Sequence, residues 1–154
     1  MSSSSHPLDQ LLADQNLDQV ISDCVTLVRD EVSSKKGLSG TVIKGGLKVI
    51  EKVKPNILSA LFFSLLPSFV ENLKPLHERF TEDHSSTQDN FAQFLTKNSV
   101  EVAALLLAVT DERAQKSKLG ALVSVYRKLR PLAQDQIVQA VPSLARLLSK
   151  HGVS

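Results

Sequence analysis

The sequence predicts an all-α protein, a compact bundle of about six to eight helices. Apolar residues recur at the three- and four-residue spacing of amphipathic helices along most of the chain. No stretch of useful length alternates apolar and polar residues, and hairpin dipeptides such as Asn-Gly are absent. With 154 residues, 42% of them apolar and 22% charged, the chain has the size and composition of one globular domain.

We expect this domain to cover residues 9–150, after a disordered Ser-rich N-terminus at 1–8 and before a tail at 151–154. Its first long helix is predicted to begin at Asn16-Leu17-Asp18-Gln19, which has the pattern of a capping box. Lys35-Lys36-Gly37 should end it, because cations suit the carbonyl end of a helix and glycine suits a left-handed cap. The apolar stripe of this helix consists of Leu17, Val20, Ile21, Cys24, Val25, Val28 and Val32.

A second helix is predicted to follow Ser39-Gly40-Thr41 and to end at Pro55, which disfavours a helical conformation at the residue before it. At 100° per residue, its apolar residues cover one face and most of its charged residues cover the other. The apolar face consists of Val42, Ile43, Leu47, Val49, Ile50 and Val53, and the charged face of Lys44, Lys48, Glu51 and Lys52.

A third helix, capped by Asn56, should be apolar on nearly every side over residues 57–66. A helix of this kind lies at the centre of a protein or is covered by a partner. Phe62 and Phe63 are therefore the candidate apolar interface. Downstream, Pro67 and Pro75 are each predicted to bend the chain or to begin a new helix.

In the second half, an acidic linker at 79–87 should precede a short helix over 88–96. Asn98-Ser99-Val100-Glu101 has the pattern of a capping box that opens a buried helix. After a break near residues 116–120, one helix is predicted to end at Pro131. The last helix should then run over 132–150, with Pro142 inside it.

The two halves of the chain resemble each other, which suggests two tandem helical units at about 16–78 and 88–150. Three matches occur in the same order, at offsets of 81, 76 and 75 residues. The alternative is coincidence, because Pro, Asp and Lys recur at helix ends for local reasons. The matched segments are Val28–Glu31 with Val109–Glu112, Lys54-Pro55 with Arg130-Pro131, and Leu66–Phe69 with Val141–Leu144.

Charge is balanced overall, at +2, but divided into blocks. Residues 9–31 are strongly acidic, whereas 35–54 and 113–150 are basic. The most ordered basic feature is a ridge of lysines at i,i+4 spacing on the second helix, a candidate surface for an anionic ligand, an anionic membrane or a protein. Aromatic residues do not interleave with it, which disfavours nucleic acid. The candidate surface consists of Lys35, Lys36, Lys44, Lys48 and Lys52.

We find no motif that predicts a catalytic residue, a metal ligand or a cofactor site. Gly37-Leu38-Ser39-Gly40 lacks the spacing of a phosphate-binding loop and is interpreted as a turn between helices. Cys24, the single cysteine, lies on an apolar stripe, so we expect a buried, inert thiol. Asp30-Glu31 and Asp111-Glu112 precede lysines near helix ends, which favours salt bridges over acid–base catalysis. His77-Glu78 lacks the spacing of a helical zinc motif.

Several of these motifs together resemble an uncharacterised family of small all-helical bacterial proteins, a domain of unknown function. They are Gly37-Leu38-Ser39-Gly40 with Ile43-Lys44-Gly45, Lys54-Pro55, Leu66-Pro67-Ser68-Phe69-Val70, Thr110-Asp111, and Tyr126 through Arg130-Pro131. The resemblance covers most of residues 28–148. It implies a helical, soluble, bacterial protein and assigns no activity to any residue.

These observations favour a non-enzymatic protein–protein interaction or scaffold module. The alternative is a peripheral binder of anionic membrane or nucleic acid through the lysine ridge. An unknown protein partner and self-association into a homo-oligomer are both compatible with the apolar third helix. We see no secretory signal and no apolar run of the roughly 20 residues that a bilayer requires, so the cytoplasm is the predicted location.

Overall fold

The computed structural model of the chain describes residues 6–83 and 90–153, and these residues contain helices and no strand. The all-α prediction is therefore confirmed, and so is the expected number of helices. The elements are the 3-10 helix η1 (Pro7–Leu12) and the α-helices α1 (Asp14–Ser33), α2 (Gly37–Glu51), α3 (Ile57–Asp83), α4 (Phe91–Lys97), α5 (Ser99–Lys116) and α6 (Gly120–Lys150).

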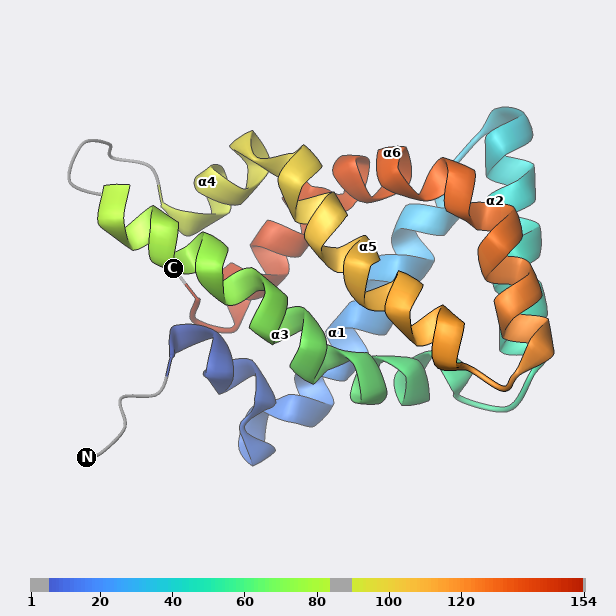
Figure 1. The fold of residues 1–154 in the computed structure, drawn as a ribbon, viewed down its shortest axis with the longest axis horizontal. Coiled ribbons are helices and arrows are strands. Elements are labelled where there is room, and N and C mark those ends of the chain that lie inside the picture. Colours follow the sequence, from blue (N-terminus) through green and yellow to red (C-terminus); the bar gives the residue numbers. More distant parts are fainter. Residues whose placement is uncertain (1–5, 84–89, 154) are drawn as a thin grey trace.

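Two long helices, α3 and α6, organise the bundle (Figure 1). α5 packs between them, α1 packs against both, and α4 and η1 close one end. α2 forms the opposite end of the molecule and packs against the first half of α6. The core lies where η1, α1, α3, α4, α5 and the C-terminal half of α6 meet.

Four prolines lie inside the two long helices, and the predicted helix end at Pro131 is wrong. α3 likewise continues through Pro67 and Pro75. A proline in a helix interior costs about 3 kcal/mol. Because Leu66 and Val70 beside Pro67 are buried in the core, the packing of one continuous helix offsets this cost.

The predicted capping boxes at Asn16 and Asn98 are also wrong. Both side-chain amides donate to backbone carbonyl oxygens earlier in the chain, at 2.8 and 2.7 Å, instead of accepting from the following turn. A capping box does form at Asn90, before α4. The predicted left-handed glycine is confirmed at Gly37, with φ of +74°.

Both ends of the domain pack more tightly than the sequence predicts. Leu8 is buried in the core rather than part of a disordered N-terminus, whose residues 1–5 lie outside the described chain. Val153 is buried as well, so the residues after 150 do not form a free tail. The predicted linker begins inside α3, which extends to Asp83, and its residues 84–87 lie outside the described ranges.

Length and composition alone would allow α3 to cross a membrane, because its segment Ile57–Glu82 reaches a mean hydropathy of 1.3. Among the described helices, α4 and α5 meet the same criterion only as a pair bent by 86°. The core helix of a globular protein passes this test too. Since α3 packs against η1, α1, α2, α4 and α5, we interpret it as a core helix.

A glycine pair in α2 provides a test of the close approach at the α1–α2 turn. A Cβ atom at Gly40 would lie 2.7 Å from the backbone carbonyl carbon of Lys35, whereas a Cβ at Gly45 meets nothing within 4 Å. We expect Gly40→Ala to lower the free energy of unfolding in urea by about 1–3 kcal/mol. Gly45→Ala should raise it by up to about 1 kcal/mol through helix propensity. Equal effects of the two replacements would contradict this account of the turn.

Acid stability should depend on Asp23, which ties the C-terminus to α1. Burial raises the pKa of this carboxyl, but hydrogen bonds from His151, Lys150 and Gln19 outweigh it and hold the pKa below its usual value of 3.8. The His151 Nε2 atom lies 2.7 Å from the carboxylate. A lowered pKa stabilises the fold above pH 3.8, and this stabilisation is lost as the pH falls through the folded-state pKa.

We therefore expect the free energy of unfolding to drop as the pH falls below about 3.8, and expect Asp23→Asn to remove part of that drop. Urea denaturation of both proteins over this range measures the difference. Parallel pH profiles for wild type and Asp23→Asn would show that this carboxylate does not contribute.

Candidate functional site

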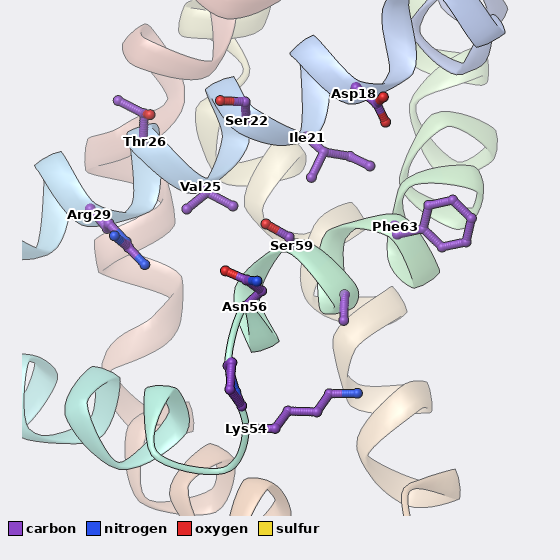
Figure 2. A pocket seen from close by; sticks show the side chains of 12 residues that line it. Asp18, Ile21, Ser22, Val25, Thr26, Arg29, Lys54, Asn56, Ser59 and Phe63 are labelled. Atoms are coloured by element: carbon purple, nitrogen blue, oxygen red, sulfur yellow. The ribbon is translucent and has the colours of Figure 1, made fainter.

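Two hollows in the structure are large enough to hold a ligand. The first is an open groove of about 790 Å³ between α1 and the turn before α3. Figure 2 shows that side chains of α1, including Asp18, Val25 and Arg29, face Asn56 and Ser59 across it.

Most side chains that line the groove are polar or exposed, so it is a feature of the surface. Arg29 is engaged elsewhere, in an ion pair with Glu51 at 2.7 Å. Phe63 stands at one end of the groove and is 63% exposed (Figure 2). The groove therefore has apolar area at its edge but no enclosed space.

The second hollow is an internal cavity of about 390 Å³ in the apolar core. None of the residues that line it is exposed, and almost all are apolar. Small-molecule sites in proteins have volumes of roughly 300–1,000 Å³, mostly apolar walls and a few polar groups. The walls are Leu11 of η1; Val20, Cys24, Leu27, Val28, Glu31 and Val32 of α1; Lys35; Ile43 of α2; Phe62, Leu66, Phe69, Val70 and Leu73 of α3; Leu106 and Thr110 of α5; and Gln136, Ile137, Ala140, Val141, Leu144, Leu147 and Leu148 of α6.

The cavity is long and narrow because α1 and α6 run antiparallel along it. Glu31 contacts Ser143, and Asp23 contacts His151, which sets the direction of the two helices. The lining residues of α6 extend from Gln136 to Leu148, about 18 Å along the helix axis at 1.5 Å per residue. A volume of about 390 Å³ over this length corresponds to a mean cross-section of about 20 Å², which suits one extended chain.

Charged groups of the cavity wall gather at one end, where the last turn of α1 faces the middle of α6. The ammonium group of Lys35 lies 3.6 Å from Glu31 and donates to Gln139 at 2.9 Å. Ser143 donates to Glu31 at 2.8 Å. The Lys35 side chain is only 13% exposed, so its charge is largely withdrawn from solvent.

Gln136 is the least satisfied polar group of the cavity. Its side-chain oxygen is buried and accepts no hydrogen bond from the described residues. Buried polar atoms nearly always have a partner, so a lone acceptor in a cavity wall indicates a place for a donor. Gln136 lies one helical turn before Gln139, on the same side of α6 as the partner of Lys35.

A second polar cluster lies beside the cavity and joins α5 to α6. Arg130 donates twice to Asp111, at 2.8 and 3.0 Å, and Tyr126 donates to the same carboxylate. The Arg130 hydrogen bonds, with a smaller contribution from Tyr126, hold the pKa of Asp111 below its usual value. Burial and the bond to Asp111 raise the pKa of Tyr126. Thr110 lies 2.7 Å from Tyr126 and completes a structural network whose partners satisfy one another.

The buried thiol predicted at Cys24 is confirmed. Desolvation, with a smaller effect of Asp23, raises its pKa to about 12. A thiol with such a pKa carries almost no thiolate at neutral pH and is a poor nucleophile. Cys24 thus serves as part of the apolar wall.

The lysines proposed as one surface separate into two groups. Lys36, Lys44, Lys48 and Lys52 are exposed, whereas Lys35 belongs to the polar end of the cavity. The candidate apolar interface divides in the same way, list included: Phe62 lines the cavity and Phe63 faces the groove.

Salt bridges predicted for the acidic pairs are confirmed at Glu31, Asp111 and Glu112. The sequence reasoning missed Gln136 and the cavity itself. A usable signal existed, since Gln136, Gln139 and Ser143 follow helical spacing on a face that also carries Ala140 and Leu144.

Two of the segments matched between the halves face the same cavity. Leu66 and Phe69 beside Pro67 line it from α3, and Val141 and Leu144 beside Pro142 line it from α6. Lys54-Pro55, by contrast, precedes α3, whereas its counterpart lies inside α6. Duplication of a helical unit stays a prediction.

Among the described residues, no group of three or more His, Cys, Asp or Glu side chains is placed to hold a metal ion. Comparison with protein families gives a match over residues 8–152 to a family described as one of unknown function. No curated protein and no solved structure matches the chain.

Proposed function

The chain belongs to this family of unknown function (DUF6918), and from its cavity we propose that it is a non-enzymatic binding protein for a single-chain amphiphile of the fatty-acid class. One observation supports this function above the others. A narrow apolar cavity carries its charged groups at one end only, at Glu31 and Lys35.

The energetics of the core favour a ligand. Apolar cavities destabilise a protein by about 24 cal/mol per Å³, so a cavity of about 390 Å³ would cost about 9 kcal/mol. The whole stability of a domain is about 5–15 kcal/mol. An acyl chain that occupies the cavity would restore the missing dispersion contacts with Leu66, Val70 and Val141.

The polar end accounts for the head group. An ammonium group has three N–H donors, so Lys35 retains one for a ligand oxygen beside Glu31 and Gln139. A carboxyl group would accept from Lys35 and, when protonated, donate to the side-chain oxygen of Gln136. A purely apolar ligand would leave both groups unpaired.

Calorimetry with palmitic acid and its methyl ester tests the proposal. We expect the acid to bind, and expect thermal unfolding at 100 times its Kd to shift upward by about 5–10 °C, from about 2.7 kcal/mol of linkage. Lys35→Met should weaken binding of the acid at least tenfold and change binding of the ester little. Lys36→Met is the matched control, because Lys36 is adjacent but exposed and outside the cavity.

Failure of both palmitic acid and its ester to bind, or to shift unfolding, would contradict the proposal. Equal weakening by Lys35→Met and Lys36→Met would place the carboxyl group elsewhere. The prediction of a protein partner or scaffold role, and those of a cytoplasmic location and a bacterial origin, stay predictions.

A further inference from the structure

The outer face of α2 carries apolar side chains that the fold leaves in solvent. Leu38 is 89% exposed, Val42 41% and Val49 46%. Their spacing of four and seven residues places them on one stripe of the helix, which also contains Gly45. The opposite side of α2 packs on the bundle, where Gly46 approaches Leu129.

The lysine ridge runs along the side of this stripe. Lys44, Lys48 and Lys52 are exposed and make no ion pair with the residues that the structure describes. Glu51, the acidic residue among them, is paired with Arg29 at 2.7 Å. The positive charge of the ridge is therefore not neutralised by the protein.

A fourth cation borders the stripe from the other side. A shallow hollow of about 320 Å³ lies between α2 and α6, and Lys128 lines it together with Val42 and Val49. Apolar side chains flanked on both sides by exposed lysines, on a helix at the end of the molecule, form an amphipathic surface (Figure 1).

We propose that this face of α2 docks on the surface of an anionic phospholipid bilayer, with Leu38, Val42 and Val49 entering the headgroup region and the lysines binding the lipid phosphates. Interfacial helices combine these two features. A nucleic-acid backbone would use the lysines but not Leu38, and no aromatic residue lies on this face to stack on a base. The inference does not depend on the ligand of the cavity.

Cosedimentation with vesicles of phosphatidylcholine, with and without phosphatidylglycerol, tests this docking. We expect binding to the mixed vesicles only, weakened by added salt. Replacing Lys44, Lys48 and Lys52 with Gln should weaken it on the order of 100-fold, since each lysine near an anionic surface contributes about fivefold. Leu38→Ser should weaken it about tenfold or more.

Matched controls separate local from bulk effects. Gln15→Glu, Gln115→Glu and Gln134→Glu together remove the same net charge at exposed sites outside α2 and should leave most binding intact. Val100→Ser removes an apolar side chain that is exposed on α5, and should leave binding unchanged.

Three results would overturn the proposal. The first is equal binding to neutral and anionic vesicles, or to neither. The second is retention of a DNA duplex through the lysines with no effect of Leu38→Ser, which would assign the ridge to nucleic acid. The third is a dimer in sedimentation equilibrium that Leu38→Ser dissociates, which would assign the face to a second copy of the chain.

Discussion

Phe62→Asp is expected to unfold the protein, whereas Phe63→Asp is expected to leave it folded. The two residues are neighbours on α3 and have opposite surroundings. Phe62 lines the cavity and packs against the core, and Phe63 is mostly exposed. Loss of the Phe62 burial removes about 1.5–3 kcal/mol, and an unpaired carboxylate in an apolar cavity adds several kcal/mol.

Together these terms approach the whole stability of a domain, about 5–15 kcal/mol. Circular dichroism and thermal unfolding measure the effect, with Phe63→Asp as the matched control. Near-native unfolding of Phe62→Asp, with unchanged mass in solution, would show that Phe62 supports neither the core nor an oligomer.

Ala140→Phe is expected to abolish ligand binding while raising the melting temperature. Ala140 lies on the α6 wall, midway along the cavity, so an aromatic ring there occupies the space proposed for the acyl chain. Burial of the ring should contribute up to about 1.5–3 kcal/mol. Affinity for palmitic acid should fall at least 100-fold.

The matched control is Ala108→Phe, which places the same ring on an exposed position of α5. It should change neither affinity nor stability by much. Calorimetry and thermal unfolding of both variants decide the question. Unchanged affinity in Ala140→Phe would mean that the amphiphile binds outside the cavity, and a lowered melting temperature would mean that the wall cannot accept the ring.

The sequence by itself determined the all-α class, the turn at Gly37, the break before α6 and the exposed lysines of α2. Apolar periodicity and a glycine that favours positive φ act over a few residues, so they can be interpreted without knowledge of the fold. The burial of Cys24 followed from the same periodicity.

Only the tertiary structure decided the continuity of the proline-containing helices, the packing of both chain ends and the cavity. In each case the deciding contacts join distant residues. Glu31 and Ser143 are separated by 112 positions, and Lys35 and Gln139 by 104. Local patterns carry no information on such pairs. The free energy that holds Pro67 inside a helix, or brings Lys35 to a cavity, comes from the packing of whole elements.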